Sequence, residues 1–418
     1  MAQHNMTESN RNSSTTNALA SKYRLLLLAN LDWHGKTQVD KHHLTAGFAR
    51  HGWDVIYSSG AQSLWQRNEE RWQRAGPFAS FEWIDLGGGK SFRLDAPGKL
   101  FARHPGKALW NRMAIKHQAK RLKIKCNKAD GKGTIAVVFD PGFGPYLDEL
   151  DADYVIFYMY DSYAHVGNWT DTDQANLELA LQHSDMIVAV AASMARELPG
   201  KAPERARILP HGVDAASIMA AAAQPCPEDL AVIPHPRIGY TGRISRKFDL
   251  ELMRDIATAR PDWHWVCVGR IGVGFSGAAE YDKALTECRN LPNIHFLGEK
   301  HYHEIAAYQN HIDVGVVPMS VSRKGFWTVG NPMKLIEFLA AGKPVVSYDN
   351  ESTRLYEDVV DIVTGKDAWI DALEKNIRGQ ERATPEQRQA VAMNNTWDQR
   401  IVQLEQWISE LVTTKDTC

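Results

Sequence analysis

The chain has 418 residues, a length typical of two or three domains. Lys and Arg number 48 against 50 Asp and Glu, so the formal net charge of −2 argues against a nucleic-acid-binding protein that relies on bulk positive charge. No run of about 18 apolar residues occurs, so no transmembrane helix is predicted. The 5 cysteines include no C-x-x-C pair, which disfavours a disulfide framework or a zinc site and fits a cytoplasmic protein.

The first half of the chain alternates apolar strands with helices. Residues 1–21 are polar and are expected to form a disordered tail. Arg24-Leu-Leu-Leu-Leu-Ala-Asn30 is a continuous apolar run, which is typical of a parallel strand covered on both faces. A helix over 38–51 and a strand over 54–58 complete a βαβ unit. Further strands are predicted over 82–86, 134–139, 154–160, 186–190 and 207–209.

A second alternating series follows an alanine run and four prolines, which predict a linker over 216–235. Two such series predict an α/β protein with two doubly wound Rossmann-like domains, over 22–215 and 236–392, that face a central cleft. Residues 393–418 are expected to carry a terminal helix. The strands of the second series are predicted over 237–241, 264–268, 294–297, 314–317 and 343–347, and its helices over 249–259, 303–310, 332–341 and 397–412.

The segment Gly242-Arg-Ile-Ser-Arg-Lys247 follows the first strand of the second series. In open α/β sheets, ligands bind outside the carboxyl ends of the strands. Gly242 permits close approach of the backbone, while Arg243 and Lys247 bring positive charge to a helix N-terminus, itself an anion site. The segment is therefore a candidate diphosphate clamp, with a solvated basic turn as the alternative.

The segment 330–346 combines a helix start, an apolar helical face, a terminating glycine and a buried strand. Pro332 suits a first helical turn. On the helix that follows, Lys334 is placed for a phosphate and Glu337 for hydrogen bonds from a ribose. A lone Lys-x-x-Glu would indicate only an amphipathic helix with solvated charges, but the combined pattern favours a nucleotide site.

These motifs resemble the GT-B glycosyltransferases, enzymes with two Rossmann-like domains that use nucleotide-activated sugars, and the second half resembles their group 1 type. The resemblance implies that the N-terminal domain binds the acceptor, that the C-terminal domain binds the donor, and that the terminal helix crosses back to the first domain. It also implies diphosphate contacts from Arg243 and Lys247. The matching segments are 206–214, 239–244, 265–269, 293–298, 313–318 and 334–346.

One departure from the family pattern bears on stereochemistry. The common retaining subgroup carries a second Glu eight residues before Glu337, where this chain has Val329. The turn Asn331-Pro-Met-Lys334 is instead similar to the donor-site turn of the inverting glucuronosyltransferase that builds xanthan side chains. That similarity implies donor contacts from this turn, including Asn331, Met333 and Lys334, and from Glu337, which stands in place of a Gln.

Asp161 is the candidate base. It follows the apolar strand 154–160, so it should lie at the carboxyl edge of the sheet, where it can take a proton from an acceptor hydroxyl. The alternative is an Asp that caps the next helix. His165 is a second catalytic candidate, with a surface-loop histidine as the alternative. The loop after the first strand, with Trp33, His34 and Gly35, is expected to line the acceptor side unless it is a plain connection.

Residues 99–132 carry 11 Lys or Arg and one acid, Asp130, with interleaved large apolar residues that include Trp110. A basic amphipathic stretch with Trp is typical of a segment that rests on anionic lipid, although charge runs are more often solvated helix faces. Contact with the cytoplasmic face of a membrane would bring the enzyme to a polyprenyl-linked acceptor.

The leading hypothesis is an inverting sugar transferase in surface polysaccharide or glycolipid assembly, with a UDP-sugar as donor and a glycan or lipid-linked acceptor. No metal or other cofactor is expected, because a helix dipole with Arg243 and Lys247 can stabilise the departing nucleotide diphosphate. A nucleotide-sugar epimerase or hydrolase of the same fold, or an inactive binding protein, is the alternative. A Rossmann dehydrogenase is disfavoured because no G-x-G-x-x-G follows the first strand.

Overall fold

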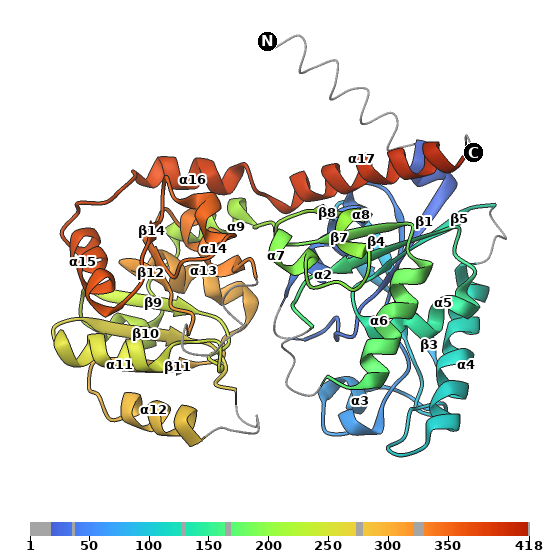
Figure 1. The fold of residues 1–418 in the computed structure, drawn as a ribbon, viewed down its shortest axis with the longest axis horizontal. Helices are drawn as coiled ribbons and strands as arrows, with labels where there is room; N and C mark the ends of the chain where they lie inside the picture. The colour runs from blue at the N-terminus through green and yellow to red at the C-terminus, as the bar shows by residue number, and fades with distance from the viewer. Residues whose placement is uncertain are drawn as a thin grey trace, which may run out of the picture. The chain divides into compact units, whose positions relative to one another are not determined.

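The computed structural model describes residues 18–35, 38–126, 131–163, 169–272, 279–320 and 330–416. They divide into two units (Figure 1): the stretch up to Leu209 together with residues from Arg400 onward, and the stretch Pro210–Gln399. Each unit is built on a mainly parallel sheet between helices, so the predicted α/β class with two Rossmann-like bodies is confirmed.

The first unit holds an eight-stranded sheet in the order β3-β4-β2-β1-β5-β6-β7-β8, in which only the edge strand β3 runs antiparallel. The predicted apolar run forms its central strand β1, where the leucines from Leu25 to Leu28 are fully buried. The strands are β1 Tyr23–Leu28, β2 Asp54–Ser58, β3 Ser80–Asp85, β4 Ser91–Ala96, β5 Gly133–Val138, β6 Tyr154–Met159, β7 Met186–Ala189 and β8 Ala206–Ile208.

Strand β4 is absent from the sequence prediction, which places a single strand in this region. Its residues, Ser-Phe-Arg-Leu-Asp-Ala, alternate polar and apolar as a half-buried strand does, so the pattern was a usable signal that the prediction missed. In the structure Asp95 is buried, accepts hydrogen bonds from Ser58 (2.5 Å) and Gln118 (2.6 Å), and pairs with Arg121. Tertiary partners therefore satisfy a charge on a strand face that the alternation would assign to solvent.

Helices cover both faces of this sheet. The last helix, red in Figure 1, lies against the first unit: Ile401 packs on Gly47, and Glu405 accepts hydrogen bonds from Trp53 (2.8 Å) and His51 (3.1 Å). The helices are α2 Asp40–Arg50, α3 Glu70–Arg74, α4 Ala108–Cys126, α5 Gly144–Leu150, α6 Asp171–His183, α7 Ala192–Ala195, α8 Ala202–Arg205 and α17 Trp397–Asp416, with 3₁₀ turns η1 Leu64–Gln66 and η2 Pro141–Phe143.

The predicted disordered tail, 1–21, lies mostly outside the described residues. Its last residues correct the prediction: residues 18–22 are helical, and Leu19 and Ala20 are 8% and 6% exposed. Two apolar side chains in a polar stretch are enough to anchor one helical turn against a core, a contact that composition does not indicate.

The second unit holds a six-stranded parallel sheet in the order β11-β10-β9-β12-β13-β14. Its strands are β9 Arg237–Thr241, β10 His264–Val268, β11 Ile294–Gly298, β12 Val314–Val317, β13 Val345–Ser347 and β14 Asp361–Ile362. Its helices are α9 Ala215–Ala220, α10 Glu228–Ala231, α11 Leu250–Ala259, α12 Ala279–Arg289, α13 Tyr302–Asn310, α14 Met333–Ala340, α15 Lys366–Ile377 and α16 Pro385–Met393, with η3 Ala221–Ala223 and η4 Thr353–Tyr356.

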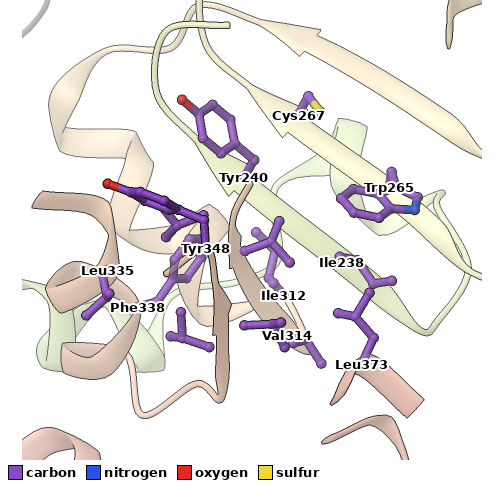
Figure 2. Close-up of a cluster of buried hydrophobic side chains, with 14 of the residues drawn as sticks. Ile238, Tyr240, Trp265, Cys267, Ile312, Val314, Leu335, Phe338, Tyr348 and Leu373 are labelled. Atoms are coloured by element: carbon purple, nitrogen blue, oxygen red, sulfur yellow. The ribbon is translucent and has the colours of Figure 1, made fainter. Parts of the chain in front are cut away.

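The core of the second unit positions β9 and α14 (Figure 2). Tyr240 of β9 and Leu335 and Phe338 of α14 belong to one cluster of buried side chains. A side chain at Gly315 of β12 would bring its Cβ within 2.4 Å of the Phe338 ring, so the glycine lets α14 lie directly on the sheet. This packing holds the first turn of α14 near the end of β9.

The segment 216–235, expected to be a linker, belongs to the second unit and is largely helical. Leu230 and Ile233 are 0% and 4% exposed and form a small cluster with Val266 and Val268 of β10. Proline and alanine composition indicated a connection, but apolar side chains between the prolines pack it onto the sheet.

The basic segment forms α4, and its charges are partly paired. Lys116 lies 2.6 Å from Glu149, and Lys123 lies 3.0 Å from Asp151. Leu122, which the interfacial interpretation would place toward lipid, is fully buried. In the part of the chain that the structure describes, no helix is long and apolar enough to span a bilayer.

Candidate functional site

The carboxyl edge of the second sheet is formed by three glycine-containing loops that hydrogen-bond to one another. Gly242 donates from its N–H to Val268 (2.8 Å), and Gly269 donates to Gly298 (2.8 Å). A Cβ at Gly269 would lie 2.1 Å from the carbonyl oxygen of Gly242. Gly242 and Gly269 have φ of 134° and 148°, so both backbones follow paths that favour glycine. The loops after β9 and β10 can therefore pack directly together.

A lysine and a glutamate from the first turns of α14 stand beside this edge. A Cβ at Gly242 would lie 3.1 Å from Cε of Lys334, and Nζ of Lys334 lies 5.1 Å from the centre of the Tyr240 ring. Glu337 accepts a hydrogen bond from Gln309 of α13 (2.9 Å), and the same amide nitrogen donates to Thr241 at the end of β9 (3.1 Å). The structure thus brings together three predicted donor residues: Gly242, Lys334 and Glu337.

Burial shifts both charged groups toward their neutral forms. It lowers the pKa of Lys334, which the charge of Glu337 opposes. It raises the pKa of Glu337, against the hydrogen bond from Gln309 and the charge of Lys334. The ammonium group of Lys334 is half-buried, and its charge is only partly compensated. A bound phosphate would replace the favourable interactions with water that the ammonium group has lost, so the site is suited to an anion.

The remaining predicted donor residues lie around the same edge. Arg243 is exposed, and within the described residues its guanidinium has no hydrogen-bond or ion-pair partner. Lys247 is half-buried farther along the same loop, where its carbonyl accepts a hydrogen bond from Ser320, after β12. Asn331 is 9% exposed, and its amide nitrogen has no partner among the described residues. Met333 begins α14 and is half-buried.

A cavity of about 550 Å³ with mixed polar and apolar walls opens beside these loops. It lies at the carboxyl ends of β10 and β11, next to the Gly269–Gly242 contact, and is within the range of small-molecule sites. The sequence analysis did not single it out, although the glycines after two successive strands were a usable signal. Its lining consists of Gly269, Arg270, Ile271, Arg289, Phe296, Gly298 and Glu299.

The carboxyl edge of the first sheet carries two carboxylates on neighbouring strands. Asp161 follows β6 and accepts a hydrogen bond from the N–H of Ser162 (2.9 Å). It does not cap the next described helix, α6, because that cap is Thr170. Asp140 follows the adjacent strand β5 and accepts from Gly142 (2.8 Å). Burial raises the pKa of Asp140, opposed by this hydrogen bond and by the charge of Lys41.

A buried lysine at the start of α2 shares this edge. Lys41 is 3% exposed, and its Nζ lies 3.4 Å from the centre of the Tyr160 ring. Burial lowers the pKa of Lys41, while the charges of Asp40, Asp140 and Asp161 raise it. The ammonium therefore sits within the field of three carboxylates. The sequence analysis missed Lys41 and Asp140; the strand-end rule that selected Asp161 also applies to Asp140.

The predicted acceptor loop is only partly available to a ligand. The Trp33 ring packs against His42 (4.9 Å between centres) and Phe92 (4.5 Å). His34 is exposed, with its ring nitrogen 3.7 Å from Glu82 of β3. Gly35 closes a turn by donating to the Asp32 carbonyl (3.2 Å), a role that belongs to the plain connection considered as the alternative. His165 lies outside the described residues.

No group of three or more His, Cys, Asp or Glu in the described ranges is arranged to hold a metal ion. The chemistry that these residues can supply is electrostatic and acid–base. The second unit offers cations and backbone N–H groups for an anion, and the first offers carboxylates for a proton.

Residues 235–378 match the protein family described as Glycosyl transferases group 1. Sucrose-phosphate synthase from Thermosynechococcus elongatus superposes with a TM-score of 0.72 at 15% identity, covering 94% of this chain and 100% of that one. The chain has the GT-B fold. The resemblance to the group 1 type is confirmed over residues 235–378, which include Lys334 and Glu337.

Two further proteins are similar to this chain. TuaH of Bacillus subtilis (strain 168), named as a teichuronic acid biosynthesis glycosyltransferase, is 32% identical over 167 residues, 38% of this chain. The aligned part spans 40% of the length of that relative. The Anabaena protein HepE, in complex with UDP-glucose, has a TM-score of 0.63 at 13% identity, covering 94% of this chain and 100% of that one.

Proposed function

We propose that the chain transfers a glycosyl group from a UDP-sugar to a hydroxyl of a glycan or lipid-linked acceptor in polysaccharide biosynthesis. The observation that carries this proposal is the pair Lys334 and Glu337 beside Gly242 at the carboxyl end of β9. The teichuronic acid relative supports the polysaccharide role, and the HepE complex supports UDP as the nucleotide.

The donor end of the proposed mechanism is electrostatic. The diphosphate would lie against the Gly242 loop, with Lys334, Arg243 and Lys247 as counter-charges and the N-terminus of α14 as a dipole. Glu337 would accept hydrogen bonds from the ribose or sugar hydroxyls. When the bond between the anomeric carbon and the phosphate oxygen breaks, these groups stabilise the charge that develops on the leaving nucleotide diphosphate.

The acceptor end requires a base. In the proposed inverting reaction the acceptor oxygen bonds to the anomeric carbon on the face opposite the diphosphate, and its proton passes to Asp161. Asp140, one strand away, is the second carboxylate within the field of Lys41. The positive charge of Lys41 would favour the ionised form of these carboxylates, which is the form that can accept a proton.

We also propose that segment 99–132 rests on the cytoplasmic face of an anionic membrane. Leu109, Met113 and Ile124 of α4 are 76%, 59% and 69% exposed. Lys107 and Arg112 are exposed and have no ion-pair partner within the described residues. Flotation with anionic vesicles tests this: the variant with Lys107→Ser and Arg112→Ser should float less than the wild type, and equal flotation would contradict it.

The function itself is tested by ligand-induced thermal stabilisation and by nucleotide release. UDP-glucose and UDP at a hundred times their dissociation constants should stabilise the second unit by about 2.7 kcal/mol, whereas GDP- and ADP-sugars at the same concentration should not. UDP release from UDP-sugar should require an added glycan acceptor. Acceptor-independent release would favour the hydrolase or epimerase alternative, and binding without release under any condition would favour an inactive binding protein.

A further inference from the structure

An apolar cavity of about 300 Å³ opens at the carboxyl edge of the first sheet, apart from the carboxylates described above. Its walls come from the segments that follow β2 and β4, the segment that precedes the antiparallel β3, and one face of α4. The lining residues are Ala61, Pro77, Phe78, Ala79, Pro97, Gly98, Leu100, Phe101, Ala114, His117 and Gln118.

The cavity contains almost no polar group that is free to bind a sugar. Gln118 donates to Asp95 (2.6 Å) and accepts from Arg121 (3.2 Å), and the His117 ring stacks on Phe101 with 3.9 Å between centres. Every other lining side chain is apolar. Such a wall recognises hydrocarbon, because only the removal of apolar surface from water would stabilise an occupant.

The mouth of the cavity exposes large apolar side chains on a firm backbone. Phe78 and Leu100 are 75% and 59% exposed although both line the cavity. Their segments are joined by backbone hydrogen bonds, from Lys99 to Gly76 and from Leu100 to Pro77, both 3.0 Å. Exposed apolar patches of this kind mark sites that another apolar surface covers.

The segment that lines part of the cavity and continues into α4 is rich in cations. No Asp or Glu occurs in the sequence from 96 to 129, which runs past the cavity and along α4. Lys107 and Arg112 near the start of α4 are exposed and have no ion-pair partner in the described stretches. The acids that pair with the later lysines, Glu149 and Asp151, lie in and beyond α5. An apolar cavity with a cationic border is complementary to a hydrocarbon chain that carries an anionic head.

The cavity is also connected to the carboxylate edge. Ala61, in its wall, donates from its N–H to the Tyr146 hydroxyl (2.8 Å), and Gly60 packs on Phe143 and Tyr146. Phe143 belongs to the 3₁₀ turn that begins directly after Asp140. One wall of the cavity therefore packs against the turn that follows Asp140, at the carboxyl edge that carries the candidate bases.

From these observations we propose that the cavity binds the hydrocarbon chain of a phosphate-linked lipid that carries the acceptor. This inference rests on the proposed function, since it names the class of acceptor. The cavity volume of about 300 Å³ is at the lower end of the range for ligand pockets. It is large enough for one hydrocarbon chain. Lys107 and Arg112 would face the phosphate.

Single-chain phosphates are suitable probes. Calorimetric titration of the full chain with decyl phosphate, hexyl phosphate and inorganic phosphate, below micelle concentrations, should show affinity that rises with chain length by about tenfold for each two methylene groups buried. Decanol should bind more weakly than decyl phosphate. Affinity that does not depend on chain length would overturn the proposal.

The variant Phe78→Asp should weaken decyl phosphate binding at least about tenfold, because it places a carboxylate at the mouth. Val232→Asp is the matched control: Val232 is 80% exposed but belongs to the second unit. Unchanged binding in Phe78→Asp would contradict the proposal, as would vesicle flotation that needs Phe78 without any decyl phosphate binding. Folding of the first unit in both variants is checked by circular dichroism and thermal unfolding, and folding of the second unit by thermal stabilisation with UDP. Failure of the wild type to bind UDP would count against the proposed function and not against the cavity.

Discussion

The carboxyl edges of the two sheets have the same parallel construction but different chemistry. In the second unit this edge consists of close-packed glycine loops with Lys334 and Glu337 beside them. In the first unit it carries carboxylates, a buried lysine and an apolar cavity. An anionic donor requires backbone N–H groups and cations, while an acceptor requires a base and a surface shaped to its carrier. In the proposed function, the same architecture would serve two ligands of different chemistry.

Replacing the proposed base should have the largest effect. Asp161→Asn removes the proton acceptor, so kcat should fall about a thousandfold while UDP binding to the second unit stays unchanged. Asp148→Asn is the control, because Asp148 lies at the surface in a pair with His183 (3.0 Å). If Asp140→Asn removes activity and Asp161→Asn does not, the base is one strand away from the predicted position.

Removing the cation of the second edge should weaken donor binding next. Lys334→Met should lower UDP-glucose affinity about a hundredfold, because a charge-assisted contact with the diphosphate is lost. Lys343→Met provides a matched control: burial lowers the pKa of Lys343 as well, but this lysine lies just before β13, on the opposite edge of the same sheet. Equal affinities in calorimetry for wild type and Lys334→Met would remove the lysine from the donor site.

The close packing of the donor loops should appear in stability. Gly269→Ala would place Cβ against the Gly242 carbonyl and should reduce the free energy of unfolding by about 2 kcal/mol. Gly298→Ala is the comparison variant, since Gly298 has a positive φ (74°, against 148° for Gly269) and open space around it, so its loss measures a positive φ without a steric contact. Urea denaturation should therefore show a larger loss for Gly269→Ala. Similar losses would mean that backbone strain alone explains the glycine.

The smallest effect concerns Asp140. Because burial raises the pKa of Asp140, the stability it contributes is present below the ordinary carboxyl pKa and is lost as pH rises through the raised value. Asp140→Asn should therefore raise Tm by about 2 °C at pH 7.5, with the difference vanishing toward pH 4. Calorimetry across this range tests the sign, with the exposed Glu69→Gln as control. A lower Tm for Asp140→Asn at pH 7.5 would show that Lys41 stabilises the carboxylate more than burial destabilises it.

Most strands, and the position of Lys334 and Glu337 on a helix at the strand ends, followed directly from the sequence pattern. Continuous apolar runs such as Leu25–Leu28 can only be buried on both faces, so they indicate parallel strands wherever they occur. Strand β4 was missed although its residues alternate, and the burial of its Asp95 depends on partners on α4 and β2. The helical structure within 216–235 was not predicted, because the burial of its apolar side chains depends on contacts with β10.

The candidate sites show the same division. Lys334 and Glu337 lie on one helix, so their spacing in the sequence indicated that they are close. Gln309, which donates a hydrogen bond to Glu337, lies on another helix, so the sequence did not indicate this contact. Lys41 carried no local signal of burial. The apolar cavity joins residues as distant as Ala61 and Gln118, and no pattern along the chain connects them.

By itself, the sequence determined the α/β class, most of the strand order along the chain and the chemical types available at the strand ends. These depend on periodicity and local residue preferences, which act over a few residues. Only the tertiary structure decided which charges are buried, which loops touch and where apolar side chains leave a cavity. Those properties arise from contacts between segments far apart in the chain, such as Gly242 with Gly269. The residues near each position in the sequence do not indicate such packing.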